Sequence, residues 1–270
     1  MGRQLIGLVS DPDLTCRALA CKRDLADMSD AHSIADISYG GITRPFYFRG
    51  ATSDEQVVKD VFQQQQYNLN RLRRAPELVE FAKAQERKGR RPLIVDAGAN
   101  IGASALYFVL TFPNACVVAI EPDRGNHHLL SKNTQGLHVK AYHAAVCSTK
   151  GRMNVFDPGE GHWGYRTRPI EAGETAAGSV PSLRINDLYD EYGHDYFPFI
   201  VKVDIEGAER DLFAEATEWV AKTPVVIVEL HDWLLPKQGI AQPFLKCISN
   251  LNRDFVQIGE DAFSIANDLG

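Results

Sequence analysis

Three things that the sequence lacks narrow the class of protein. The 270-residue chain has five cysteines, an odd number with no C-x-x-C pair, so neither a disulfide framework nor a zinc knuckle is indicated. No apolar run is long enough for a membrane span, and no cationic start with an apolar core marks a signal peptide. A basic excess is also missing, since the net charge is −6. We therefore expect a reduced, cytoplasmic protein with no nucleic-acid partner and no membrane partner.

A glycine-rich turn after an apolar run is the most informative pattern that is present. The run ends at Asp96 and is followed by Gly98, Asn100 and Gly102. Glycine lets a backbone approach a ligand closely because it has no Cβ, and a helix that starts after the turn offers free N–H groups. The third glycine of the NAD-type G-x-G-x-x-G pattern is missing. The carboxylate of Asp96 beside the turn favours a cationic amine over a pyrophosphate.

A second acidic residue follows at the spacing of a βαβ unit. Glu121 ends another apolar run, 25 residues after Asp96, and Pro122 then stops the strand. An acid at this position binds the ribose hydroxyls of a nucleotide, because a carboxylate accepts both hydrogen bonds. Glu121 alone does not distinguish NAD from other nucleoside cofactors, whereas its combination with the turn at Asp96 does.

Apolar runs and helical patterns alternate from residue 92 onward, which predicts an α/β sheet. We expect strands at 92–97, 116–121, 137–142, 199–204, 224–230, 253–258 and 262–266, and shorter ones at 152–157 and 180–186. The last two core strands are close enough for a hairpin, which makes the final strand antiparallel. The sequence thus divides into an N-terminal extension, residues 1–90, and a cofactor-binding domain, residues 91–270.

The N-terminal extension shows weaker patterns. We expect a short strand at 45–49, a helix after 52–54 and a second helix at 76–85, which together cap the sheet or one side of the cofactor cleft.

Residues 158–179 form a long irregular stretch, and loops of this length are usually functional or disordered. Aromatic side chains such as Trp163 and Tyr165 favour contact with a substrate, and a mobile surface insertion is the alternative.

A third motif resembles a known family. The segment Phe199-Ile-Val-Lys-Val-Asp-Ile-Glu-Gly-Ala-Glu209 is similar to the signature of the FkbM methyltransferases. Other motifs follow in the order of that family: Thr52-Ser-Asp54, Asp96–Gly102, Ile120-Glu-Pro122, Asn133, Ala144-Ala-Val146, Gly151 and Ile185-Asn-Asp-Leu188. The resemblance covers about residues 45–235. It departs at Cys147-Ser148, where a Gly-Asp or Ser-Asp pair is common.

The resemblance implies a Rossmann-like class I methyltransferase, with a mostly parallel seven-stranded sheet, a C-terminal antiparallel strand and helices on both faces. It implies transfer of a methyl group from S-adenosylmethionine to a hydroxyl of a sugar, glycolipid or secondary metabolite. The expected cofactor-binding residues are Asp96, Gly98, Asn100, Gly102, Glu121, Pro122, Ala145 and Asp204. A small-molecule or glycan acceptor is expected at Glu206, Trp163 and Tyr165. A homo-oligomer is compatible with the sequence.

The expected catalytic residues lie after the fourth and fifth strands and are Asp204, Glu229 and His231. A hydroxyl is a poor nucleophile, so a base or a metal should help to remove its proton. We expect His231 to be a base near neutral pH, and no metal, although these three residues form an alternative ligand set for a divalent cation. In another interpretation, Asp204 caps the next helix and Glu206 and Glu209 complement its N-terminus. The interior Lys202 should point outward or pair with an acid, for which Glu229 is our candidate.

Two other functions stay open at this point. The first is methyl transfer to nitrogen or carbon of a small molecule or peptide, because an amine needs less help from a base than a hydroxyl does. The second is a non-catalytic or NAD-type nucleotide-binding protein, against which the spacing of Gly98 and Gly102 argues.

Overall fold

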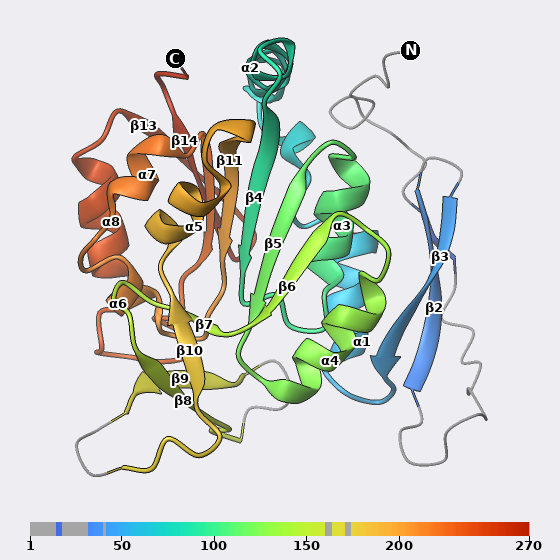
Figure 1. Cartoon of the computed structure of the whole chain (residues 1–270), viewed down its shortest axis with the longest axis vertical. Coiled ribbons are helices and arrows are strands. Elements are labelled where there is room, and N and C mark those ends of the chain that lie inside the picture. The colour runs from blue at the N-terminus through green and yellow to red at the C-terminus, as the bar shows by residue number, and fades with distance from the viewer. Residues whose placement is uncertain (1–14, 18–31, 40–41, 160–163, 171–173, 270) are drawn as a thin grey trace.

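A seven-stranded sheet forms the centre of the molecule (Figure 1). The structure is a computed structural model, and it describes residues 15–17, 32–39, 42–159, 164–170 and 174–269. The strand order is β13-β14-β12-β11-β4-β5-β6, and β14 runs antiparallel to both of its neighbours while the other pairs are parallel. Its strands are β4 (Arg91–Ala97), β5 (Cys116–Glu121), β6 (Val139–His143), β11 (Tyr196–Val203), β12 (Val225–Glu229), β13 (Arg253–Ile258) and β14 (Asp261–Ala266). This is the arrangement of a Rossmann-like class I methyltransferase, so the predicted fold class is confirmed.

Two hydrophobic clusters cover the two faces of this sheet. Because successive side chains of a strand point to opposite faces, Ile94 of β4 belongs to one cluster while its neighbours Leu93 and Val95 belong to the other. Strands buried on both faces read as continuous apolar runs in the sequence, which is why β4, β5, β11, β12 and β14 were predictable, whereas the edge strands β6 and β13 are half-buried or exposed throughout. The observed ends differ from the predicted ones by three residues at most, at the start of β11.

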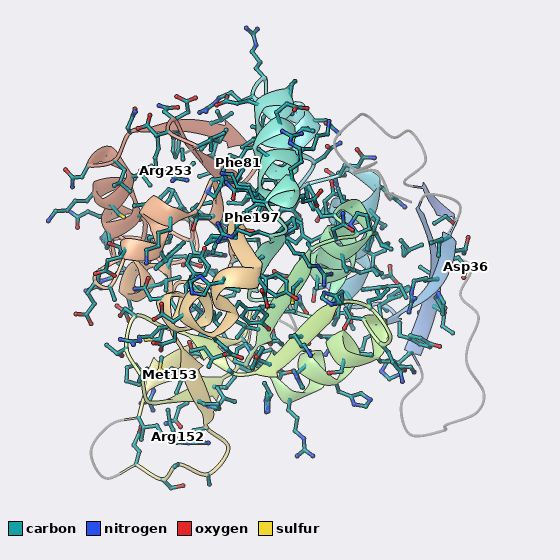
Figure 2. The ribbon with its side chains drawn as sticks, turned by 45° about the horizontal axis from the view of Figure 1, so that its top comes forward. Asp36, Phe81, Arg152, Met153, Phe197 and Arg253 are labelled. Carbon is teal, nitrogen blue, oxygen red and sulfur yellow. The ribbon has the colours of Figure 1, made fainter. Side chains whose placement is uncertain are left out.

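Helices pack on both faces of the sheet, as Figure 1 shows. One face carries α2 (Ala75–Arg87), α3 (Ala103–Thr111) and α4 (Arg124–Asn133), and the other carries α5 (Ile185–Tyr192), α6 (Glu209–Leu212), α7 (Glu218–Lys222) and α8 (Ala241–Ser249). Phe81 of α2 packs edge-on against Phe197 of β11, with ring centroids 5.6 Å apart (Figure 2). In the described part of the chain, no helix is both long and apolar enough to cross a bilayer.

The N-terminal part contains more β-structure than the sequence indicated. Strands β1 (Thr15–Arg17), β2 (His32–Tyr39) and β3 (Ile42–Arg49) form a separate antiparallel sheet, where only residues 45–49 were expected as a strand. The segment continues through α1 (Asp54–Val58), a π-helical turn η1 (Lys59–Gln63) and a 3-10 turn η2 (Leu69–Arg71). Phe46 and Phe48 are buried in the same cluster as Phe108 and Ile200. The division at residue 90 stays a prediction, and one core extends across it.

A third, four-stranded sheet lies below the main one in Figure 1. Its order is β7-β10-β8-β9, formed by β7 (Ala145–Val146), β10 (Val180–Leu183), β8 (Arg152–Phe156) and β9 (Arg166–Pro169). The prediction of an irregular stretch over 158–179 was wrong for β9, which pairs with β8. The strand predicted at 180–186 ends at Leu183 because α5 begins at Ile185, and a short 3-10 turn, η3 (Gly193–Asp195), follows that helix.

Candidate active site

A cavity of about 410 Å³ opens where β4, β5, β11 and β12 end. The carboxyl ends of parallel strands are the usual ligand site of such sheets. Ten of the residues predicted from the sequence line it: Gly98, Asn100, Glu121, Pro122, Ala145, Tyr165, Asp204, Glu206, Glu229 and His231. Asp96 and Gly102 lie beside the cavity without lining it, and Trp163 is outside the described residues. The N-terminal segment closes one side, as expected, through Val57, Asp60, Val61, Gln66 and Tyr67.

The two glycines of the turn are required by contacts within the protein. Gly98 has a φ of 78°, and a Cβ on it would lie 1.7 Å from the carbonyl oxygen of Asp204. Gly102 has a φ of 91°, and a Cβ there would lie 2.8 Å from Leu130 of α4. Both positions therefore need glycine for the loops and helices to pack. Gly98 still presents its backbone to the cavity, whereas Gly102 faces α4.

A buried lysine lies between two acids at the base of the cavity. Lys202, which is 2% exposed, donates a hydrogen bond to the carbonyl of Gly98 at 2.7 Å. Its Nζ lies 3.4 Å from Asp96 Oδ1 and 3.2 Å from Asp204 Oδ2. The predicted pair with Glu229 was wrong, because Lys202 lies opposite Asp96 in the sheet register. Burial opposes the charge of Lys202, but Asp204 and Asp96 outweigh it and raise its pKa.

Asp96 is part of this arrangement and not a free carboxylate. It is fully buried, and its Oδ2 accepts a hydrogen bond from Ser104 at 2.6 Å. Burial raises the pKa of Asp96, while Lys202 acts in the opposite direction. The cation that we expected beside Asp96 is thus supplied by the protein itself, and a ligand amine in the cavity would meet Asp204 first.

Glu121 is fixed by the backbone of two loops. The N–H of Asn100 donates to Oε2 and the N–H of Asp123 donates to Oε1, both at 2.8 Å. Asn100 reaches this place with a left-handed φ of 49°. Burial raises the pKa of Glu121 to about 7, against the two backbone hydrogen bonds that lower it. Each carboxylate oxygen retains a lone pair for a hydroxyl of a ligand.

The imidazole of His231 is surrounded by carboxylates. It is 1% exposed, and its Nδ1 lies 3.0 Å from Oε1 of Glu209, which is fully buried. The other oxygen of Glu209 accepts from the N–H of Gly207, while Oε1 also accepts from the N–H of Ile205. His231 Nε2 faces three further carboxylate oxygens, at 3.5 Å in Glu229, 3.6 Å in Glu206 and 3.7 Å in Asp204.

These charges change the role that His231 can take. Burial alone would lower its pKa, but the hydrogen bond and charge of Glu209, together with Asp204 and Glu206, raise it to about 10. A histidine with this pKa carries its proton near neutral pH, which does not favour the expected role as base. Burial and the charge of Asp204 raise the pKa of Glu229, so Glu229 is a proton acceptor of useful strength beside it.

The helix-capping interpretation fits one acid of the motif. Glu209 is in the first turn of α6 and binds loop N–H groups, as that interpretation requires. Asp204 points to Lys202 and His231 instead, and α6 shows no side-chain cap in the part of the chain described. Glu206 has a left-handed φ of 56°, which directs its carboxylate toward His231.

Several residues of the cavity wall were not predicted from the sequence. Trp233 and Leu234 follow β12 and line the cavity, and Trp233 is 67% exposed. Glu260 lies in the β13–β14 turn, and Asp60 lies in η1. The apolar spacing of Val57 and Val61 indicated a helix but gave no sign of what it faces. Six carboxylates and two basic side chains line the cavity among the described residues: Asp60, Glu121, Asp204, Glu206, Glu229 and Glu260, against Lys202 and His231.

Comparison with known proteins agrees with this arrangement. The model of a family described as "Methyltransferase FkbM domain" matches residues 96–258, which is more than half of the chain. The chain belongs to the FkbM methyltransferase family. It is 28% identical over 169 residues to "Methyltransferase sdnD" of Sordaria araneosa, and 25% identical over 165 residues to "2-O-methyltransferase NoeI" of Sinorhizobium fredii. The matches cover 50% and 52% of this chain, and 65% and 64% of those two proteins, so the chain spans less than two thirds of the length of each.

Two solved structures show a remote likeness to this FkbM protein. An O-methyltransferase from Bacillus cereus in complex with SAH has 10% sequence identity and a TM-score of 0.37, over 80% of this chain and 98% of that one. The MycE methyltransferase in complex with Mg, SAH and mycinamycin VI has 13% identity and a TM-score of 0.33, over 86% and 62%. Scores this low carry no argument about ligands or substrates.

Proposed function

We propose that this FkbM methyltransferase uses S-adenosylmethionine to methylate a hydroxyl of a sugar, glycolipid or secondary metabolite. The observation that carries the proposal is the excess of carboxylates over basic groups around the cavity. S-adenosylmethionine has a sulfonium and an ammonium against one carboxylate, so these carboxyl groups favour it, and a bound cation in turn stabilises the ionised form of Glu121 and Glu229, whose pKa burial raises. NAD has an anionic pyrophosphate, which the same carboxylates would repel.

Different residues of the cavity face different parts of this cofactor in the proposal. Glu121 is positioned for the ribose hydroxyls, since backbone N–H groups fix both of its oxygens and leave lone pairs free. Asp204 is positioned for the ammonium of the amino-acid end, next to the backbone of Gly98. Ala145 and Pro122 offer apolar surface for the adenine. Lys202 does not face an anion of the ligand in this scheme, because Asp96 and Asp204 neutralise it.

Methyl transfer needs alignment and the removal of one proton. The acceptor oxygen attacks the methyl carbon in line with the sulfur, the new C–O bond forms, and the C–S electron pair returns to sulfur. Glu229 lies at the end of β12 on the cavity wall and is our candidate for the proton acceptor. His231 lies 3.5 Å from Glu229 Oε1, where it positions this carboxylate. Asp204, Glu229 and His231 therefore remain the proposed catalytic group, with the base moved from His231 to Glu229.

The acceptor enters beside aromatic residues in this proposal. Trp233 and Tyr165 line the cavity from different elements, and Trp233 is the more exposed. A flat indole face packs well against the apolar side of a sugar or polyketide ring. One relative is named as a 2-O-methyltransferase, which supports a hydroxyl acceptor.

The test is a methyl-transfer assay with matched acceptors. Purified protein and labelled S-adenosylmethionine are incubated with a panel of methyl glycosides, and in parallel with the amino sugars in which one hydroxyl is replaced by an amine. The proposal expects a product methylated on oxygen, identified by mass spectrometry and NMR. Methylation of the amino sugars alone would contradict it in favour of an N-methyltransferase.

A further inference from the structure

The geometry points to a divalent-cation site formed by Asp204, Glu206 and His231 at the floor of the cavity. These residues each offer a ligand atom, and the three atoms lie within 4.8 Å of one another. Oxygen and imidazole ligands of this kind suit Mn²⁺ or Zn²⁺. The inference deepens the proposed function, on which its role in the reaction rests, but the cation site itself is testable without an acceptor.

The distances around His231 Nε2 fit a shared cation better than direct hydrogen bonds. Charged hydrogen bonds measure about 2.7–2.9 Å, whereas Nε2 lies 3.6 Å from Glu206 and 3.7 Å from Asp204. A four-coordinate cation with bonds of about 2.0–2.2 Å separates its ligand atoms by about 3.3–3.6 Å. The observed separations are close to that range.

The orientation of His231 is a second observation, independent of the acidic cluster. The side chain is 1% exposed, and Nε2 makes no hydrogen bond to any residue that the structure describes. Nδ1 is held by the fully buried Glu209, so Nε2 is directed at Asp204 and Glu206, and a cation that binds there displaces the Nε2 proton to solvent. A carboxylate on the far nitrogen is the usual outer partner of a metal-binding histidine, because it fixes the tautomer and the ring.

Each carboxylate is also held in place for this role. Lys202 pairs with Oδ2 of Asp204, which leaves Oδ1 to face His231. The left-handed backbone of Glu206 brings its Oε2 to the same point. Both carboxylates line the cavity, so a cation there keeps an open position toward a ligand, as catalytic sites do.

The cation would assist the proposed reaction by binding the acceptor hydroxyl. A bound cation lowers the pKa of that oxygen, and the released proton passes to Glu229. The oxygen then attacks the methyl carbon of S-adenosylmethionine, the C–S bond breaks, and sulfur keeps the electron pair as S-adenosylhomocysteine leaves. Glu229 lies 3.5 Å from His231, on the wall next to this site.

The experiment titrates the chelator-treated full chain with Mn²⁺ and follows the EPR signal of free Mn²⁺. We expect saturable binding of one Mn²⁺ per chain. Glu206→Gln should weaken binding by more than about tenfold, and Glu209→Gln, which removes the outer partner, by about 10–100-fold. Glu260→Gln is the matched control, because it removes a carboxylate of the same cavity that is not one of the three proposed ligands and should leave the Kd unchanged.

Two results would overturn the inference. One is the absence of Mn²⁺ binding to the wild-type chain. The other is an equal loss in Glu260→Gln and Glu206→Gln, since that pattern means diffuse attraction by the cavity. Thermal unfolding of each variant shows that it is folded. S-adenosylhomocysteine is also titrated into the same metal-free samples. Binding of S-adenosylhomocysteine without binding of Mn²⁺ would contradict the cation site alone, and binding of Mn²⁺ without binding of S-adenosylhomocysteine would contradict the proposed function alone.

Discussion

Lys202 and Asp96 form an ion pair between neighbouring strands that is buried on both sides, with side-chain exposures of 3% and 0%. Breaking a buried pair from one side leaves an uncompensated charge and costs about 3–5 kcal/mol. We expect Lys202→Met to lower the free energy of unfolding by that amount in urea denaturation. The double variant Lys202→Met/Asp96→Asn should recover part of the loss. Equal stability of Lys202→Met and wild type would contradict this account of the site floor.

Gly98 and Gly89 make a matched pair of substitutions. Both have a left-handed φ, 78° and 81°, but a Cβ on Gly98 would lie 1.7 Å from the Asp204 carbonyl while one on Gly89 meets nothing within 4 Å. Alanine costs about 1–2 kcal/mol at each from backbone strain, and overpacking adds about 1–3 kcal/mol at Gly98 alone. We therefore expect Gly98→Ala to be the less stable in urea and to bind S-adenosylhomocysteine more weakly. Equal loss of stability in the two variants would show that the closeness of the Asp204 carbonyl to Gly98 adds no cost to the substitution.

Glu121 should contribute to cofactor affinity through hydrogen bonds to the ribose. We expect Glu121→Gln to weaken S-adenosylhomocysteine binding by about 1–3 kcal/mol in calorimetry, the usual value for hydrogen bonds to a charged group. Glu215→Gln, an exposed carboxylate that does not line the cavity, is the control and should bind as wild type does. An unchanged affinity in Glu121→Gln would mean that Glu121 only holds the two loops in place, through the backbone N–H groups of Asn100 and Asp123.

The buried acids predict how stability depends on pH. Burial raises the pKa of Glu121 and of Asp261 to about 7, from 4.5 and 3.8. A carboxyl whose pKa is higher in the folded state favours folding below the unfolded pKa, and this advantage is lost as pH rises through the folded pKa. The raised pKa of His231 acts in the same direction, toward about 10.

The free energy of unfolding of the unliganded protein should therefore fall between about pH 5 and about pH 8. Glu121 alone accounts for about 3 kcal/mol, since one pKa unit corresponds to about 1.4 kcal/mol. Urea denaturation across this range measures the slope, and Glu121→Gln should flatten it. Stability that rises over the same interval would show that these acids are ionised in the folded chain.

Most of the fold was predictable because buried parallel strands leave a strong pattern. The strand patterns and the Gly259 turn gave the sheet, the resemblance implied its mostly parallel arrangement with an antiparallel C-terminal strand, and the structure confirms both. Strand β2 was missed because its buried side chains are Ser33, Ala35 and Ile37, whereas Ile34 is only half-buried. Only Ala35 and Ile37 are hydrophobic in phase with burial, and Ile34 between Ser33 and Ala35 breaks the alternation, so the pattern is too short to mark the strand.

The candidate site was predictable in its residues and not in its pairings. Acids at the ends of neighbouring strands must meet at one edge of the sheet, which gave Glu121, Asp204 and Glu229. The partner of Lys202 depends on register, which places Asp96 opposite it. The hydrogen bond between Glu209 and His231 joins residues that are 22 positions apart in the sequence, and no local pattern predicts it. Trp233 follows the same strand as His231, yet its exposure depends on tertiary structure.

The central claim is that the cavity binds S-adenosylmethionine and not a dinucleotide. Calorimetric titration of the purified chain with S-adenosylhomocysteine, with NAD as the control, tests it most directly. The account predicts saturable binding of S-adenosylhomocysteine at one site per chain and no binding of NAD, because the carboxylates of the wall repel its pyrophosphate. Saturable binding of NAD without binding of S-adenosylhomocysteine would contradict it.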